Sequence, residues 1–134
     1  MQDRPTAKEL LGAIADFLIK EAIPVLEEKD KLLGYKALVS WNMLGVIGRE
    51  IEKEEAILEE DIRGLQEVLG KKSESVSGSP MRLDDKKETS VQLSKLLLDK
   101  IQKEEISSPQ SPEWKFVKES LKRKLAISNP RFPT

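Results

Sequence analysis

The side chains with the clearest capacity for chemistry lie mid-chain, where Asn42 and Arg49 interrupt a largely apolar stretch. Their seven-residue spacing places them on one face of an α-helix. A buried guanidinium requires a carboxylate or an anionic ligand, because an unpaired buried charge is very costly. Three interpretations stay open. Arg49 forms an internal ion pair that fixes the helix register, it binds an anion or polar ligand in a cleft beside Asn42, or it is simply exposed. The carboxylates available for the internal pair are Asp3, Glu9 and Asp99.

The composition argues against most catalytic chemistry. The chain contains no histidine and no cysteine. This excludes the Ser-His-Asp triad, the Cys-His pair, zinc sites built from these residues and every disulfide. General acid–base catalysis would fall to Asp, Glu, Lys or Tyr35, and none stands in a recognisable constellation. We therefore expect a non-enzymatic protein with no cofactor and no metal.

Two motifs are more typical of structure than of chemistry. Residues 64–73 (GLQEVLGKKS) resemble a phosphate-binding loop, but five residues rather than four separate the glycines, and Lys72 replaces the hydroxyl residue. The acidic run from Glu50 to Asp61 offers carboxylates for a hard cation, but they are spread around the helix. We interpret the first motif as a helix end and the second as a solvated face.

Charge is balanced over the chain and separated within it. Lys and Arg number 23 against 24 Asp and Glu, so no overall field favours nucleic acid or an anionic membrane. Residues 50–67 hold eight acids and two bases, whereas residues 113–131 hold six bases and two acids. Two interpretations stay open: solvated helix faces that pack near each other, or a basic face for an anionic ligand such as a phosphate or a CoA-like tail.

Helical periodicity runs through the first half of the chain. Thr6 and Glu9 form a capping box for a first helix, which should end or kink near Ile23 because Pro24 follows. A second helix runs from about residue 32 toward residue 54 and is apolar on most sides, which is typical of a buried central helix. Two interpretations of its glycines, Gly45 and Gly48, stay open: they permit close helix packing, or they loosen the helix.

Three further helices follow. The spacing predicts them at residues 56–69, at about 84–105, and from Ser111 as N-cap to a stop at Asn129. A mobile loop is expected at about residues 71–83, and a short tail at 129–134. No segment alternates as a strand would. We predict an all-α single domain over residues 1–134, a four- to five-helix bundle with a long, largely buried central helix.

Several segments resemble a bacterial family of small helical proteins of unknown function. They are the opening MQDRPT, Glu9-Leu10-Leu11, Asn42-x-Leu44, Arg49-Glu50, and an ending that contains Asn129-Pro130-Arg131. Genes of this family often lie beside an aminoglycoside-phosphotransferase-like kinase and an acyl-CoA dehydrogenase. The resemblance implies a bacterial protein accessory to that pair, and it transfers no catalytic residue.

The two ends carry further expectations. The polar N-terminus does not resemble a secretory signal, and no apolar run is long enough to span a bilayer, so we expect a cytoplasmic protein that binds no membrane. Our hypothesis is that both ends dock beside the central helix. Asp3 would then pair with Arg49 or Arg131, and Asn129 would cap the last helix.

The function predicted from these features is a non-enzymatic accessory or protein-interaction domain. Its partner surface would contain Trp114, Phe116 and Phe132, since Phe116 falls off the inner stripe of its helix. The alternative is a bundle that binds an acyl or phosphorylated metabolite, with Asn42 and Arg49 as its polar end. A weak enzyme that uses carboxylates alone is the third hypothesis. A homodimer is also expected to be accessible to such a bundle.

Overall fold

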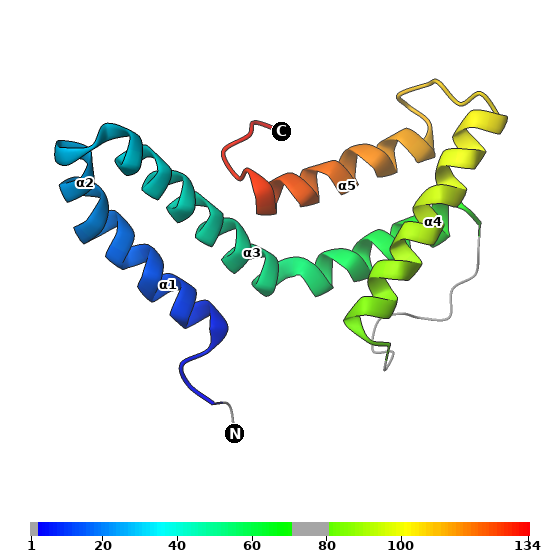
Figure 1. Ribbon diagram of the computed structural model, residues 1–134. Helices are drawn as coiled ribbons and strands as arrows, with labels where there is room; N and C mark the ends of the chain where they lie inside the picture. Colours follow the sequence, from blue (N-terminus) through cyan, green and yellow to red (C-terminus); the bar gives the residue numbers. More distant parts are fainter. Residues whose placement is uncertain (1–2, 71–80) are drawn as a thin grey trace. The chain divides into compact units, whose positions relative to one another are not determined.

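The computed structural model describes residues 3–70 and 81–134 and divides into two compact units, Met1–Lys53 and Glu54–Thr134 (Figure 1). The described residues are helical with no strand, so the all-α class and the long central helix are confirmed. Most of the loop predicted at 71–83 lies outside the described residues. A single domain over the whole chain stays a prediction. The elements in chain order are α1 (Ala7–Phe17), a π-helical turn η1 (Leu18–Ala22), α2 (Ile23–Lys29), α3 (Lys31–Val68), α4 (Leu83–Lys103) and α5 (Pro112–Ser128).

The first unit is a helical hairpin. The run from α1 to α2 lies antiparallel to the first half of α3, and Lys8 on α1 meets Glu52 on α3 (Figure 1). The predicted capping box is confirmed: Thr6 accepts from the Glu9 backbone N–H at 3.2 Å and donates its own backbone N–H to the Glu9 carboxylate at 2.8 Å.

Pro24 does not end the first helical run. Instead the π-helical turn η1 directly precedes α2, in whose first turn Pro24 lies. A proline lacks an N–H and its ring clashes with the carbonyl four residues earlier, and a wider turn accommodates both defects. The expected end or kink near Ile23 is therefore realised as a local change of helix type.

A single residue, Asp30, connects the two arms of the hairpin. Its carboxylate accepts from the backbone N–H groups of Leu32 at 3.1 Å and Leu33 at 3.2 Å, which caps the start of α3. Gly34 lies where the arms meet most closely, since a Cβ there would stand 3.1 Å from the backbone of Glu27. The close approach favours glycine at this position, because a Cβ would require Glu27 to shift by a few tenths of an ångström.

The two helices predicted at about 32–54 and 56–69 are one continuous helix, α3, of 38 residues. The predicted break was wrong because residues 50–63 contain strong helix formers and no proline or glycine. The expectation that the central helix is largely buried is also wrong for its first half, where Gly34 is the one buried residue between 31 and 53. The physical reason is that the hairpin covers this half of α3 on one side.

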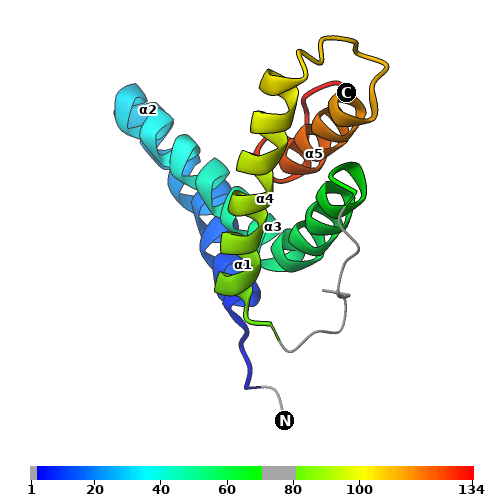
Figure 2. The same cartoon turned by 90° about the vertical axis from the view of Figure 1, so that its right-hand side faces the viewer.

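The second unit contains the apolar core. Its buried residues come from the end of α3 and from α4, and partly buried side chains of α5 pack against them. The loop at 104–111 connects α4 to α5 (Figure 2). The core residues are Ile62, Leu65, Leu93 and Leu97, with Val68, Leu69, Met81, Ile101, Phe116 and Val117 around them.

The helix ends of the second unit follow the sequence closely. Gly70 adopts a φ of 69° just after α3, a conformation that favours glycine. Ser111 caps α5 by accepting from the Trp114 backbone N–H, and Asn129 is the C-cap, as predicted. The tail from Asn129 to Thr134 is not helical. Within the described residues, no helix combines the length and the apolar character that crossing a membrane requires.

Candidate functional site

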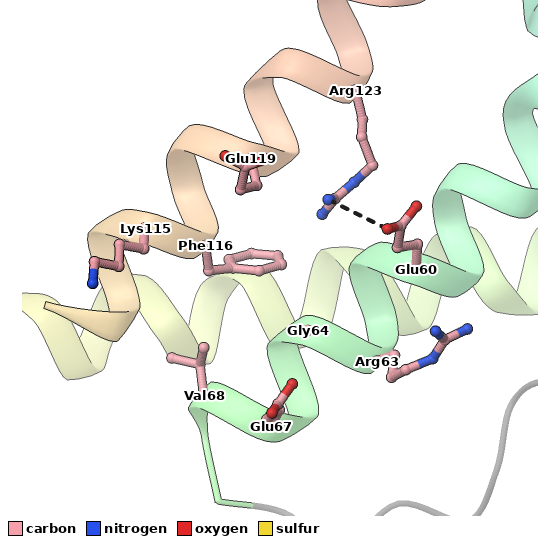
Figure 3. Close-up of a pocket in the computed structure, with 9 residues that line it drawn as sticks. All are labelled: Glu60, Arg63, Gly64, Glu67, Val68, Lys115, Phe116, Glu119 and Arg123. Carbon is pink, nitrogen blue, oxygen red and sulfur yellow. Dashed lines mark ion pairs between the residues drawn. The ribbon is translucent and has the colours of Figure 1, made fainter. Parts of the chain in front are cut away.

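A pocket of about 340 Å³ lies in the second unit between the end of α3 and α5 (Figure 3). Its floor is apolar, formed by Phe116, Gly64 and Val68, and its walls are charged. The charged side chains are three acids and three bases: Glu60, Glu67, Glu119, Arg63, Lys115 and Arg123. Because the two signs balance, the pocket presents no net charge that selects an anion or a cation.

One wall of this pocket is held by a buried ion pair. Arg123 donates to Asp61 Oδ1 from Nε at 2.9 Å and from Nη2 at 2.6 Å, while Ser120 donates to Asp61 Oδ2 at 3.1 Å. Asp61 is 3% exposed. Arg123 also lies 6.0 Å from the ring centroid of Phe116 and 3.9 Å from Glu60. Since these contacts occupy the guanidinium, this network fixes α5 on α3.

A second buried cation joins α4 to α3. Lys86 is 3% exposed, and its ammonium group lies 2.8 Å from Glu55 and 2.7 Å from Glu59. Hydrogen bonds to these two carboxylates raise the pKa of Lys86. A lysine whose pKa is raised stays protonated, so it serves as a structural cation and not as a nucleophile.

A third cation, Lys100, contacts both the end of α3 and the start of α5. Lys100 on α4 donates to the last carbonyl of α3, that of Val68, at 3.1 Å and lies 3.1 Å from the Glu113 carboxylate in the first turn of α5. The pKa of Glu113 is lowered, first by its own backbone N–H and then by Lys100. This arrangement satisfies an orphan carbonyl and a helix N-terminus together.

Replacement of Glu113 by glutamine is expected to remove a pH-dependent part of the stability. A carboxyl group with a lowered folded-state pKa stabilises the fold above its ordinary pKa of 4.5 and loses that contribution as pH falls through the lowered value. The wild type should therefore have the higher Tm at pH 7, and the difference from Glu113→Gln should vanish in strong acid. Thermal unfolding followed by circular dichroism from pH 7 to low pH tests this, and a pH-independent difference contradicts it.

The first unit has a smaller cleft, of about 200 Å³, between α1 and α3. Its residues are mostly small or apolar, with Lys8, Glu52 and Arg49 at its edges. Lys8 lies 2.9 Å from Glu52 and lowers the pKa of that carboxyl. Gly48 opens into this cleft, since a Cβ there would meet nothing within 4 Å. The interpretation that Gly48 permits close helix packing is therefore wrong. The remaining lining residues are Leu11, Gly12, Ala15, Leu44 and Gly45.

The first unit also exposes an extended apolar surface. Ile23 is the one buried apolar residue among residues 3–53, so this unit has no core of its own. Ten large apolar side chains of this unit are 42 to 63% exposed. Six of them, which are 42 to 59% exposed, form one stripe on α1 and one on α3. They are Leu10, Ile14 and Phe17 on α1 and Met43, Ile47 and Ile51 on α3, and they are called the apolar face below.

Both stripes of the apolar face lie on the same side of the hairpin. On each helix the exposed side chain stands one residue before a residue that lines the cleft: Ile14 precedes Ala15, and Ile47 precedes Gly48. On both helices, therefore, the exposed stripe is rotated about the helix axis by one residue, in the same direction, from the side that lines the cleft. Because they run antiparallel, the same turn brings both stripes to one side.

The family model described as "Domain of unknown function (DUF6285)" matches residues 27–132, which is well over half of the chain. The chain belongs to this family. The match includes the Asn129-Pro130-Arg131 ending on which the resemblance rested and begins after the opening MQDRPT. No curated protein and no solved structure matches the chain.

In this DUF6285 chain, the residues predicted for a polar site do not converge. Arg49 is half-buried at the edge of the cleft, whereas Asn42 is exposed and outside it. Asp3 and Arg131 are both exposed. Lys8 and Glu52 form an ion pair between α1 and α3. The pairing of Asp3 with Arg49 or Arg131, and the docking of both ends beside the central helix, stay predictions.

The aromatic residues predicted for a partner surface have different surroundings. Trp114 is 38% exposed and donates from its indole N–H to the Ile106 carbonyl at 2.9 Å, and Phe132 is about half exposed in the tail. The prediction that Phe116 lies off the inner face of its helix is wrong. Its ring packs against the core and over Gly64, because glycine leaves space for it there. The partner surface itself stays a prediction.

Asp61, Arg123 and Lys86 were not among the functional residues predicted from the sequence. The available signal was the charge separation, since Asp61 belongs to the acidic segment and Arg123 to the basic one. The interpretation that these two faces pack near each other is supported by the Asp61–Arg123 contact. Within the described residues, no group of three or more carboxylates is arranged to hold a metal ion.

Proposed function

We propose that this chain is a non-enzymatic protein-interaction domain that binds another protein through the apolar face. The observation that carries the proposal is the absence of a core in the first unit beside an exposed stripe on each of its two helices. An amphipathic helix is stabilised in water when its apolar stripe is covered. The hairpin covers one side of each helix and leaves this face for a further protein.

The energy available from covering the face is substantial. Full burial of a large apolar side chain contributes about 1.5–3 kcal/mol, so burying the exposed half of each contributes about 1 kcal/mol. For six such side chains the total is about 6 kcal/mol per chain. A contribution of this size is comparable with the whole stability of a small domain, which supports an obligatory rather than an incidental contact.

The proposed setting comes from the family resemblance. A bacterial cytoplasmic protein accessory to a phosphotransferase or an acyl-CoA dehydrogenase would use a second surface for that partner. Trp114 and Phe132 are exposed aromatic side chains of the second unit and suit such a contact. Co-purification of the tagged chain with either enzyme, lost in a Trp114→Ala and Phe132→Ala double variant, would support this assignment.

Introduction of a charge into the apolar face is expected to abolish complex formation. Ile47→Glu places a carboxylate in the middle of the face, and an unpaired charge opposes its burial against a partner. The matched control is Val91→Glu, which changes an exposed apolar residue of α4 in the second unit. Tagged full-length chains expressed in the native host are compared by size after gentle lysis.

Wild type and Val91→Glu should elute well above the 15.2 kDa of one chain, and Ile47→Glu should elute as a single chain. Circular dichroism of the three proteins shows whether each is folded. Elution of the folded Ile47→Glu variant with wild-type size would exclude the apolar face as the binding surface. Elution of the wild type at one chain mass would exclude the proposed function altogether.

A second candidate function is the binding of a small acyl or phosphorylated metabolite in the cleft of the first unit. The favouring observation is the open apolar space at Gly48 with the Arg49 guanidinium at its edge. The volume of about 200 Å³ is below the roughly 300–1,000 Å³ of typical ligand pockets, and this favours the interaction function. Loss of a copurifying small molecule in Gly48→Leu, detected by native mass spectrometry, would favour the cleft.

A further inference from the structure

The apolar face has a charge pattern that points to its occupant. Met43 is the most exposed of its six side chains. Lys36 and Glu50 lie seven residues before and after Met43 on α3, and a seven-residue spacing keeps all three on one helix face. Both charged side chains are exposed, and neither belongs to an ion pair among residues 3–70 and 81–134.

We propose that the apolar face binds a second copy of this chain across a two-fold axis that passes at Met43. The α3 helices of the two copies then run antiparallel, so Lys36 faces Glu50 of the partner subunit, and the reciprocal pair forms on the other side of the axis. Two hairpins joined in this way make a four-helix bundle. The inference rests on the proposed function of the face and adds the identity of the bound protein.

The symmetry of the charges favours a second copy over an unrelated partner. A two-fold axis brings together residues that lie at equal distances on either side of it. The residues at seven positions from Met43 carry opposite charges, which makes the face complementary to itself. A partner with another sequence requires no such symmetry of charge about Met43.

The area of the face is sufficient for a stable dimer. A large apolar side chain that is half exposed presents roughly 100 Å² to solvent, so six present roughly 600 Å² per chain. With the flanking charged residues included, each copy approaches the roughly 800 Å² per partner of a standard stable interface. The hairpin gains in this way the apolar layer that its own two helices do not provide.

A single cysteine tests the position of the axis. The chain contains no cysteine, so Met43→Cys introduces the only thiol. Helices in contact lie about 8–10 Å apart, within reach of a short bismaleimide. The full-length Met43→Cys chain should be converted mostly to a covalent dimer at micromolar concentration. Asn42→Cys is the matched control, because Asn42 is the adjacent exposed position turned about 100° away from Met43. This variant should yield little covalent dimer.

Charge reversal tests the identity of the partner. Lys36→Glu places like charges across the axis, and so does Glu50→Lys, so each purified variant should dimerise about tenfold more weakly than the wild type by analytical ultracentrifugation. Mixing the two variants restores opposite charges at both contacts and should restore wild-type affinity. The Lys36→Glu, Glu50→Lys double variant should also recover the wild-type affinity.

The outcomes separate this inference from the proposed function. A wild-type chain that is monomeric when pure, but elutes in a larger complex from its host in an Ile47-dependent manner, overturns the second copy and leaves the interaction function standing. A dimer in which the mixed charge variants regain no affinity, or in which Asn42→Cys cross-links as well as Met43→Cys, also overturns the inference. Restoration on mixing, with selective cross-linking at Met43, establishes it.

Discussion

Replacement of Asp61 by asparagine is expected to lower the free energy of unfolding by about 3 kcal/mol. Asparagine has nearly the same shape, but it is neutral and presents one acceptor oxygen in place of two. Asp61 is 3% exposed and accepts from both Arg123 and Ser120. The substitution therefore leaves the largely covered guanidinium of Arg123 without the carboxylate that neutralises it, which is more costly than losing an ordinary hydrogen bond.

Urea denaturation followed by circular dichroism and by the fluorescence of the two tryptophans, Trp41 and Trp114, measures this loss. The matched control is Glu60→Gln, because Glu60 lies 3.9 Å from the same guanidinium but its side chain is 58% exposed. Neutralisation of an exposed partner should change the free energy of unfolding by no more than about 1 kcal/mol. Equal effects of the two substitutions would show that burial does not determine the strength of this network.

Replacement of Gly64 by alanine is expected to destabilise the second unit by about 1–3 kcal/mol. An added Cβ would stand 2.7 Å from Cε2 and 2.8 Å from Cδ2 of the Phe116 ring, which must then move away from the core. This movement also disturbs the contact between Phe116 and Arg123. The penalty outweighs the gain of up to about 1 kcal/mol that alanine brings in helix propensity.

Gly48→Ala is the control for this substitution, because Gly48 is also a helical glycine of α3. A Cβ at Gly48 meets nothing within 4 Å, so the propensity gain should appear as stabilisation of up to about 1 kcal/mol. Denaturation midpoints of the two variants should therefore move in opposite directions from the wild type. Stabilisation by Gly64→Ala would mean that Phe116 does not pack over Gly64.

The two units differ in how their helices are stabilised. The second unit has a core around Ile62 and Leu97 and three networks of buried or half-buried charge that join its helices. The first unit joins its two arms by the Lys8–Glu52 pair and a shallow cleft. We therefore expect the first unit to depend on association, which is why variants of the apolar face should alter assembly and variants of Asp61 should alter unfolding.

Local features of the fold were predictable from the sequence because neighbouring residues determine them. The capping box at Thr6, the N-cap at Ser111 and the glycine after α3 each depend on side chains or backbone conformations within a few residues. Helical periodicity likewise indicated the all-α class. The continuity of α3 could have been recognised too, since the acidic segment lacks a residue that ends a helix.

The candidate site was less predictable because it depends on distant pairs. Arg49 was the predicted candidate for a buried charge because it lies in an apolar stretch of the sequence. The buried ion pair of the second unit instead joins Asp61 and Arg123, which are 62 residues apart. Phe116 was placed off the inner stripe of its helix, but the missing side chain at Gly64 creates space for its ring on another helix. The apolar periodicity of a helix shows which side of that helix is apolar. It does not show that a missing side chain on one helix makes room for a ring on another.

By itself, the sequence determined the helical class, the caps, the absence of histidine and cysteine chemistry, and the membership in the DUF6285 family. Only the tertiary structure decided which apolar stripes are covered and which charges are buried. The reason is that an amphipathic stripe is the same whether a helix of its own chain or another protein covers it. In the second unit the apolar stripes of the helices are buried against one another in a core. In the hairpin the apolar face stays exposed.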